Sequence, residues 1–391
     1  MLRIKMKIVI LGSVALSIPP IGHGGTEWMA YYQAKGLADQ GHQITLLAAR
    51  GSKKISNVKL IEVGGGGVVA GKKSEVKIDF SKMESSRKLR LEMTYLGEAM
   101  EKLIKHQDEY DLILNNMRGE AVFLPLAKML KKPFVNVMHL PIFPELAKLF
   151  KQYGTSIITI AEHQKRNYPH LNYLATVNNC VDTTKYSFNS NPKDYLLIMS
   201  TIGRHKNQKD AIKAAKILGE KLIIAGKIRD QDYFEQEIKP HLDGEQIKHI
   251  GEIKNFEEKV RLYQEARAFL FPILWQEPFG LVMIEAMSCG TPVIGYNNGA
   301  VPEVIRDGVT GYIIKTKNAM PAGRQEKLKI KNLIIKKRGV DGLVEGVREI
   351  KKLEIEKLRE MRRNCRRHVE ENFSIKKMVD GYEKACSKAL R

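Results

Sequence analysis

Short apolar runs alternate with longer amphipathic segments along most of this 391-residue chain. In the first half, we expect strands at the apolar runs 7–11, 42–48, 58–63, 112–115, 134–138 and 156–160. Helical periodicity fills 26–40 and 86–105, where Thr26 is the expected N-cap of the first helix and Gly41 follows its end. Strands that alternate with helices form a parallel sheet covered by helices on both faces.

The same alternation starts again in the second half. We expect strands there at 195–200, 221–225, 247–250, 268–271, 292–295 and 311–314. The expected helices lie between them at 208–218, 233–239, 256–265, 280–288 and 301–306. The pattern predicts an α/β fold with two doubly wound, Rossmann-like parallel sheets, and the chain length fits two domains of about 150–200 residues each.

The predicted domains are 1–185 and 186–391, because the turn-rich run N-S-N-P at 189–192 lies near their boundary. Ligands of doubly wound sheets bind outside the carboxyl ends of the strands. Two such domains that face each other would place the site in the central cleft between them.

The chain carries a net charge of +21, with 65 Lys and Arg against 44 Asp and Glu. An excess of this size attracts polyanions. Three interpretations stay open, namely a solvated basic face, an anionic membrane surface and nucleic acid. The sequence has none of the spaced Cys/His sets or aromatic–basic motifs that make nucleic-acid binding specific.

The first 20 residues superficially resemble a short signal peptide, because three basic residues precede the apolar run 8–18. Gly12 and Ser13 interrupt that run and two prolines end it, so we expect a buried first strand instead. No apolar stretch of the sequence approaches the roughly 20 residues that span a bilayer. The four cysteines form no C-x-x-C pair, which suits a reduced cytoplasm without a disulfide framework or a zinc site. We therefore expect a cytoplasmic protein, with peripheral membrane contact through its basic tail as an alternative.

Two segments of the second half depart from the alternation. Residues 315–339 are strongly basic and contain the run M-P-A-G, so we expect a surface insertion there. The tail 353–391 is expected to be helical, with a break near 372–374 and Ser374 as the N-cap of the last helix. Residues 372–391 are expected to cross back to the N-terminal domain.

The most informative motif runs from Glu277 to Glu285, where a proline and Gly280 mark a loop that enters an apolar helix. The backbone amides at its start, on Phe279, Gly280 and Leu281, suit a phosphate or a sugar hydroxyl. Glu285 lies deeper in the helix, where a carboxylate needs partners, and a ribose diol can donate to both of its oxygens. The alternative without a ligand is that Glu277 is an acid at a helix start and that Glu285 forms a salt bridge.

This motif resembles the signature of glycosyltransferase family 4, E-P-F-G-L-x-x-x-E-A-M-x-x-G-x-P-V-I. The match continues through G-A-V-P-E-V at 299–304 and D-G-V-T-G-Y at 307–312. Members of the family have the two-domain GT-B fold and transfer a sugar from a nucleotide donor with retention of anomeric configuration. The resemblance implies that Glu285 holds the donor ribose and that Glu277 lies beside the hydroxyls of the donor sugar. The runs G-G-T-E, D-Y-F and W-Q-E-P-F look like a bacterial branch similar to UDP-glucose:tetrahydrobiopterin glucosyltransferase and avilamycin-type transferases.

Arg204 and Lys209 lie in the run G-R-H-K-N-Q-K, between a predicted strand and the next helix. Two cations across such a turn can converge on a diphosphate, whereas a solvated basic loop is the commoner outcome. The run is similar to the family pattern G-R-x-x-x-x-K, in which both cations neutralise the donor pyrophosphate.

The loop 19–27 is rich in glycine, which lets the backbone approach a ligand closely, but it lacks the G-x-G-x-x-G spacing of a dinucleotide site. It is similar to the family loop P-x-x-x-G-G-x-E, which shapes the acceptor side and touches the donor phosphate. The resemblance assigns Gly24 and Gly25 to donor binding, while Glu27 could simply cap the helix. His139 follows the predicted strand 134–138 and resembles the family histidine at the reaction centre, although a lone histidine is usually structural.

Asp230 and Asp232 form a D-x-D pair that could hold a divalent ion, but they precede a helix, where acids are favourable. The family handles the diphosphate with Arg and Lys, so we expect no metal and no cofactor besides the nucleoside-diphosphate sugar. The run N-N-C-V-D at 178–182 resembles the family hinge N-G-V-D, with Cys180 in place of the glycine.

The sequence thus predicts a metal-independent, retaining glycosyltransferase that moves a glucose-like hexose from a UDP-linked donor to an unspecified hydroxyl acceptor. The expected catalytic residues are His139, Glu277, Arg204 and Lys209. A nucleotide-sugar-binding protein without transferase activity and a polyanion-binding protein are the alternatives.

Overall fold

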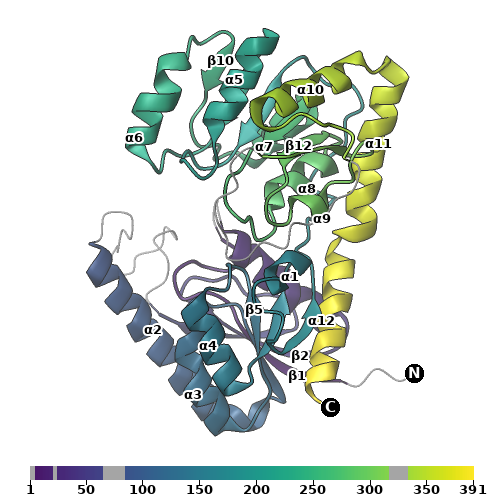
Figure 1. The fold of residues 1–391 in the computed structure, drawn as a ribbon. Helices are drawn as coiled ribbons and strands as arrows, with labels where there is room; N and C mark the ends of the chain where they lie inside the picture. Colours follow the sequence, from purple (N-terminus) through teal and green to yellow (C-terminus); the bar gives the residue numbers. More distant parts are fainter. Residues whose placement is uncertain (1–4, 21–23, 65–83, 317–332) are drawn as a thin grey trace. The chain divides into compact units, whose positions relative to one another are not determined.

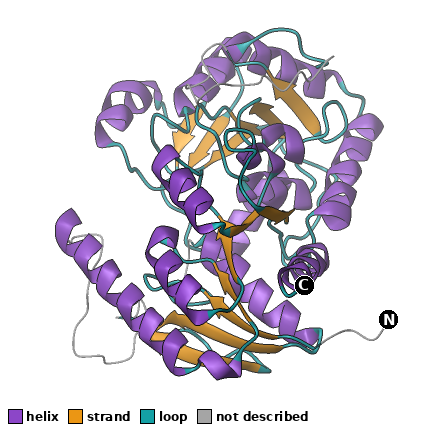
Figure 2. Ribbon diagram, turned by 60° about the horizontal axis from the view of Figure 1, so that its bottom comes forward, coloured by secondary structure: helices purple, strands orange, loops and turns teal. Residues whose placement is uncertain are grey.

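The computed structural model describes residues 5–20, 24–64, 84–316 and 333–391. The chain forms two compact units, each with one parallel sheet and helices on both of its faces (Figure 2). Unit 1 comprises Met1–Ile160, Tyr168–Asn178 and Ile375–Arg391, and unit 2 comprises Ala161–Asn167 and Asn179–Ser374. The predicted fold class, with two Rossmann-like parallel sheets, is confirmed.

Unit 1 contains a seven-stranded sheet in the order β3-β2-β1-β4-β5-β6-β7. Its strands are β1 Lys7–Leu11, β2 Gln43–Ala49, β3 Val58–Val63, β4 Leu112–Asn115, β5 Phe134–Met138, β6 Ser156–Thr159 and β7 Tyr173–Thr176. The expected buried first strand is confirmed, since β1 lies in the middle of the sheet between β2 and β4.

Five α-helices of unit 1 flank this sheet: α1 Gly25–Asp39, α2 Ser85–Lys105, α3 Glu120–Leu130, α4 Pro144–Tyr153 and α12 Ile375–Ala389 (Figure 1). Alternate residues of β1, such as Val9 and Leu11, pack in one cluster with α2 and α3. Helices α1 and α12 pack closely against each other, because a Cβ atom at Gly36 would lie 2.3 Å from a methyl group of Val379.

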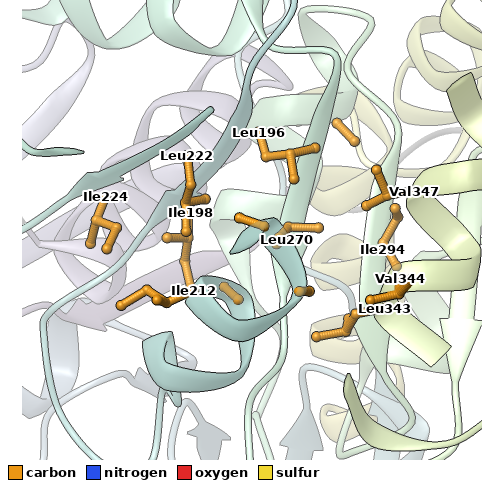
Figure 3. Packing of buried hydrophobic residues seen from close by; sticks show 14 of the residues in the cluster. Leu196, Ile198, Ile212, Leu222, Ile224, Leu270, Ile294, Leu343, Val344 and Val347 are labelled. Carbon is orange, nitrogen blue, oxygen red and sulfur yellow. The ribbon is translucent and has the colours of Figure 1, made fainter. Parts of the chain in front are cut away.

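Unit 2 contains a six-stranded sheet in the order β10-β9-β8-β11-β12-β13. Its strands are β8 Leu196–Met199, β9 Leu222–Ala225, β10 Ile247–His249, β11 Ala268–Phe271, β12 Val293–Tyr296 and β13 Gly311–Ile314. One face of the sheet packs on α5 Gln208–Leu218 and α10 Gly339–Lys352. Figure 3 shows this core, in which Leu196, Ile198 and Leu270 of the sheet lie among Ile212, Leu343 and Val347 of the two helices.

The remaining helices of unit 2 include α7 Phe256–Glu265, α8 Leu281–Ser288, α9 Val301–Val304 and α11 Ile355–Asn372. The short helix α6 Gln231–Tyr233 continues as a π-helical turn over Phe234–Ile238, so the expected helix 233–239 begins earlier and is wider. Asp230 explains the earlier start, because its carboxylate accepts a hydrogen bond from the amide of Tyr233 at 2.9 Å.

The expected N-cap of the first helix is wrong. Helix α1 begins at Gly25, Gly24 is its N-cap, and Thr26 lies inside the first turn. The amide of Trp28 donates to the carbonyl of Gly24 at 3.0 Å, so the helical hydrogen bonds start two residues before the expected cap. A threonine occurs at N2 as well as at the N-cap, and the glycines before Thr26 do not indicate from sequence that the helix has already begun.

The chain passes from unit 1 to unit 2 after Asn178, seven residues before the predicted boundary at 185, and returns after Ser374. Near the second crossing, the amide of Val181 donates to the carbonyl of Phe373 at 2.9 Å. We expect from sequence that the segment 372–391 crosses to the N-terminal domain. In the structure, α12 belongs to unit 1 from Ile375 onward. The predicted break in the tail is confirmed, because α11 ends at Asn372 and α12 begins at Ile375.

The basic segment 315–339 lies mostly outside the described residues, which resume at 333. Its two ends meet, because the amide of Gly339 donates to the carbonyl of Lys315 at 2.8 Å. The four cysteines are free thiols, and all are buried. Among the helices of the described residues, none is long and apolar enough to cross a membrane.

Candidate functional site

The donor-binding residues predicted for unit 2 gather at one edge of its sheet. The loop with Arg204 follows β8 and leads to Lys209 in the first turn of α5, while Asp230 follows β9, Glu277 follows β11, and Gly299 follows β12. These four strands are neighbours in a parallel sheet, so their carboxyl ends lie along the same edge. This edge is where doubly wound sheets bind their ligands.

Glu277 is held by two donors that the sequence interpretation missed. Its Oε2 accepts hydrogen bonds from Lys206 Nζ at 2.7 Å and from Trp275 Nε1 at 2.9 Å. The Lys206 ammonium lies 5.1 Å from the centre of the Trp275 ring, within cation–π range. Because the two side chains of this ion pair are only 15% and 12% exposed, the pair is well shielded from solvent.

A glycine after β12 allows the loop of Glu277 to lie where it does. Gly299 has a φ of 57°, and a Cβ atom there would lie 2.3 Å from both the amide nitrogen and the carbonyl oxygen of Glu277. The amide of Ala300 donates to that carbonyl at 2.9 Å. The two loops are therefore in backbone contact, which no residue with a side chain would permit at position 299.

The start of α8 presents backbone rather than side chains. Phe279 is buried, with its ring centre 5.6 Å from that of Phe373, so its side chain is an anchor. Gly280 is the N-cap with a φ of 85°, and Leu281 is the first helical residue. The first amides of a helix have no intrahelical acceptor, and they point along the positive end of the helix dipole. The donor role predicted for Phe279, Gly280 and Leu281 therefore concerns their backbone amides.

Glu285, in the second turn of α8, accepts three hydrogen bonds from elsewhere in unit 2. Its Oε1 accepts from Tyr186 Oη at 2.8 Å and from Lys259 Nζ at 2.7 Å, while its Oε2 accepts from Tyr263 Oη at 2.9 Å. Burial raises the pKa of Glu285, but Lys259 and these hydrogen bonds outweigh it and lower the pKa below its ordinary value. The carboxylate is thus ionised, and three of its roughly four acceptor positions are used.

Arg204 and Lys209 lie on either side of Tyr233. The guanidinium of Arg204 lies 5.6 Å from the centre of the Tyr233 ring, and the Tyr233 hydroxyl accepts from the amide of Lys209 at 3.0 Å. Each cation pairs with an acid, Arg204 with Asp230 at 3.4 Å and Lys209 with Glu237 at 2.5 Å. The side chain of Arg204 is 58% exposed, so it is accessible to a ligand.

Two arginines of α11 bind segments of unit 2 that precede its strands. The fully buried Arg362 donates to the carbonyls of Asn189 at 2.7 Å, Gln264 at 2.6 Å and Ala266 at 2.9 Å. Burial lowers the pKa of Arg362 to about 10, which leaves it charged at neutral pH. Arg366 donates to the carbonyl of Tyr186 at 2.6 Å, which fixes the backbone of one donor to Glu285.

The residues predicted for unit 1 lie at the carboxyl edge of the other sheet. His139 follows β5, and its Nε2 donates to Oδ1 of Asn116, which follows β4, at 2.8 Å. Asn116 and Gln33 are joined by two hydrogen bonds, of 2.8 and 3.1 Å, and both side chains are buried. Desolvation lowers the pKa of His139 to about 4, so the ring is neutral at pH 7.

A pocket of about 240 Å³ opens beside His139. Gly25 lines it with the first turn of α1, together with the loop after β1 and residues of α2. Gly24 lies just behind, where a Cβ atom would be 2.9 Å from Oε2 of Glu27. His139 and Gly25 thus share one pocket, Gly24 precedes Gly25 in the same unit, and the other predicted residues lie in unit 2.

The D-x-D pair begins a helix, as expected. Asp230 caps α6 and pairs with Arg204. The described residues contain no group of three or more His, Cys, Asp or Glu side chains that could hold a metal ion. Cys180 in the hinge-like run is buried, and burial raises the pKa of its thiol.

Five functional candidates were missed by the sequence interpretation, namely Lys206, Trp275, Tyr186, Lys259 and Tyr263. Lys206 and Trp275 belong to the runs G-R-H-K-N-Q-K and W-Q-E-P-F, but a lysine or a tryptophan in such a run does not differ by residue type from one that is solvated. Lys259 and Tyr263 are four residues apart on α7, a spacing that places both on one helix face and could have indicated a shared partner.

Comparison with known proteins gives this site a context. The family model of glycosyl transferases group 1 matches residues 182–326, which include every predicted site residue of unit 2. Sucrose synthase 7 of Oryza sativa subsp. japonica is 32% identical over 164 residues, which are 39% of this chain and 19% of the rice protein. The chain therefore spans about a fifth of the length of that relative.

Solved structures match over nearly the whole chain. A glycosyltransferase involved in avilamycin A biosynthesis has a TM-score of 0.66 at 19% identity and covers 98% of both chains. The Anabaena protein HepE in complex with UDP and glucose has a TM-score of 0.68 at 16% identity, over 98% of this chain and 99% of its own. Residues 182–326 thus match the glycosyl transferases group 1 model, within a chain that has the GT-B fold.

Proposed function

We propose that this chain is a retaining glycosyltransferase that moves a glucose-like hexose from a UDP-linked donor to a hydroxyl acceptor. The observation that carries the proposal is the carboxyl edge of the unit 2 sheet. It brings together two cations, a helix start and two carboxylates of different surroundings, inside a glycosyl transferases group 1 domain. The matched HepE structures that contain UDP, UDP-glucose, or UDP and glucose support the choice of donor.

In this proposal, the donor diphosphate binds between Arg204, Lys209 and the first amides of α8. Both cations are held by acids in the ligand-free protein, at Asp230 and Glu237. Partly exposed ion pairs contribute little, about 0–1 kcal/mol each, so a diphosphate with two or more charges can replace the acids. The same groups stabilise the charge that develops on the leaving diphosphate.

The sugar is held beside Glu277, and the ribose beside Glu285. Lys206 and Trp275 occupy one oxygen of Glu277, which leaves its second oxygen for sugar hydroxyls. Glu285 has one acceptor position left, and a ribose hydroxyl takes it or replaces the hydroxyl of Tyr186. Lys259 keeps Glu285 ionised in either case.

The reaction breaks the bond between the anomeric carbon and the diphosphate oxygen, and forms a bond from that carbon to the acceptor oxygen on the same face. The acceptor proton passes to the departing diphosphate oxygen, so the step needs no protein base. His139 suits a positioning role, because its pKa of about 4 keeps the ring neutral and the hydrogen bond from its Nε2 to Asn116 fixes the orientation of the ring. The diphosphate charge is met by side chains and amides, so the proposed reaction uses no metal or further cofactor.

The proposal is tested by UDP release and product formation with UDP-glucose, and by a thermal-shift panel of nucleotide sugars. Arg204→Ala and Lys209→Ala should each lower turnover about 10²-fold or more, as loss of a charge-stabilising donor does in other enzymes. Lys248→Ala, at an exposed position of β10, is the control and should keep full activity. Near-normal turnover in both variants would refute the assignment. Stabilisation by UDP-glucose without product from any acceptor would favour the nucleotide-sugar-binding alternative.

A further inference from the structure

One carboxylate at the carboxyl edge of the unit 2 sheet has no part in the proposed reaction. Asp210 lies in the first turn of α5, one residue after Lys209. Its Oδ2 accepts hydrogen bonds from Tyr296 Oη at 2.7 Å and from Asn207 Nδ2 at 2.8 Å. Burial, and after it the charge of Asp210, raise the pKa of Tyr296, so its hydroxyl keeps its proton and donates. Because Tyr296 is the last residue of β12, a single oxygen joins the start of α5 to the end of that strand.

Asn207 extends this connection to a third strand. Its Nδ2 also donates to the carbonyl of Pro272, which follows β11, at 3.0 Å. The residue is only 6% exposed and has a φ of 57°, a left-handed conformation that asparagine adopts more readily than most residues. Both partners of Nδ2 are oxygens that only accept, so the side-chain amide has one orientation that satisfies them. Asn207 is therefore held in place by the ends of two neighbouring segments.

Further hydrogen bonds join the loops after β8, β11 and β12. The amide of Leu274 donates to the carbonyl of His205 at 2.9 Å, which links the first loop to the second. The buried side chain of Asn298 donates to the carbonyl of Ile273 at 2.6 Å, which links the second loop to the third. The bond between Asp210 and β12 then connects the third loop back to the end of the first. The three loops are thus joined in a closed ring of hydrogen bonds.

This network fixes the backbone of a loop whose cation is exposed. Arg204 lies in the loop, and its side chain is 58% exposed. The fully buried Gln208 holds the same loop from inside, since it donates to the carbonyl of Thr201 at 3.0 Å and accepts from the amide of Gly203 at 3.4 Å. A ligand that must order such a loop loses affinity. A loop that is ordered before the ligand arrives avoids this loss.

On the basis of the proposed donor site, we infer that Asp210, Asn207 and Tyr296 are positioning residues for the donor diphosphate. They act through the loop of Arg204 and the start of α5, which carries Lys209, and hold both in the geometry that binds two phosphates. Loss of their hydrogen bonds should therefore weaken the binding of the diphosphate and leave the binding of the nucleoside unchanged.

The test measures the dissociation constants of UDP and of uridine on the full chain by titration calorimetry. The wild type should bind UDP more tightly than uridine. Tyr296→Phe removes only the hydroxyl that donates to Asp210, and it should weaken UDP binding by about three- to ten-fold, the effect of ordering one side chain on binding. Uridine binding should not change. Asp210→Ala should lose at least as much UDP affinity, whereas Asp210→Asn keeps an acceptor oxygen and should retain most of it.

Tyr195→Phe is the matched control. Tyr195 precedes β8 at the opposite edge of the sheet, is 8% exposed, and donates to the carbonyl of Leu262 at 2.8 Å. The control thus removes one buried hydroxyl of the same kind, and it should keep the ratio of UDP to uridine affinity even where it lowers the melting temperature.

An unchanged affinity ratio in both Tyr296→Phe and Asp210→Ala would overturn the inference and leave the proposed donor site standing. An equal loss of the ratio in Tyr195→Phe would also overturn it, because the effect would then be general destabilisation. Failure of the wild type to prefer UDP over uridine would instead overturn the proposed donor site, and the positioning role with it.

Discussion

Lys259→Met should reverse the sign of one contribution to the pH dependence of stability. Lys259 Nζ lies 2.7 Å from Glu285 Oε1, and the two side chains are 26% and 14% exposed. Of the influences on the pKa of Glu285, burial is the largest and raises it, and Lys259 is the next and lowers it. Removing the ammonium leaves burial, the largest influence, opposed only by the hydrogen bonds from Tyr186 and Tyr263, so the pKa of Glu285 in the folded variant should rise above its ordinary value of 4.5.

The sign follows from linkage. In the wild type, the folded pKa of Glu285 is depressed, so its stabilising contribution is present above pH 4.5 and is lost as the pH falls through the folded pKa. In the variant, the folded pKa is raised, so its contribution is present below the unfolded pKa and is lost as the pH rises. Removing one partner of a shielded ion pair costs about 3–5 kcal/mol, because the other charge is left uncompensated. That cost applies only where Glu285 is ionised, so the destabilisation caused by Lys259→Met should grow between pH 4 and pH 7 towards about 3 kcal/mol.

The assay is denaturant unfolding of wild type and variant at half-unit pH steps, followed by tryptophan fluorescence, to which Trp275 contributes from unit 2 and Trp28 from unit 1. Glu285→Gln in the Lys259→Met background is the matched control, because a glutamine cannot titrate and should abolish the extra pH dependence. A destabilisation by Lys259→Met that is the same at pH 4 and at pH 7 would show that Lys259 does not hold Glu285 ionised. The claim that Lys259 lowers the pKa of Glu285 would then be wrong.

Three further predictions concern Gly299, Arg362 and His139. Gly299→Ala should abolish the thermal shift by UDP-glucose, because its Cβ atom would lie 2.3 Å from the Glu277 backbone; an unchanged shift would show that this loop contact does not shape the donor site. Arg362→Met should destabilise unit 2 by about 3 kcal/mol or more, since three carbonyls lose a charged donor, and calorimetric unfolding measures the loss. The pH–rate profile of sugar transfer should lack a transition between pH 6 and 7 from His139, whose pKa is about 4; a transition there that disappears in His139→Gln would contradict this neutral role.

The strands could be predicted from sequence wherever burial on both faces produced an apolar run. β1, β4 and β11 each have nearly all residues buried, and their bounds match the predicted ranges 7–11, 112–115 and 268–271. The edge strand β7, Tyr173–Thr176, is only half-buried throughout and left no such run, so it was missed. Helix α3 was also missed, because Pro125 interrupts its pattern.

The candidate site could be predicted only in part, because its motifs lie on loops while its partners come from distant segments. Arg204, Lys209 and Glu277 stand in recognisable runs that follow predicted strands. Tyr186 reaches Glu285 across 99 positions of sequence and carries no local pattern that marks it. The positions of these partners depend on packing that a linear motif does not record.

The two glutamates illustrate this limit. Their spacing places Glu277 in the loop before α8 and Glu285 in the second turn of the helix, so the two carboxylates meet different neighbours. Each has its own lysine, Lys206 from the loop after β8 and Lys259 from α7. A carboxylate in a shielded site needs a compensating charge, and each of the two has a lysine ammonium at 2.7 Å. The motif therefore indicates only the two acids. The two lysines, which come from other segments, supply the opposite charges that the proposed role of these acids requires.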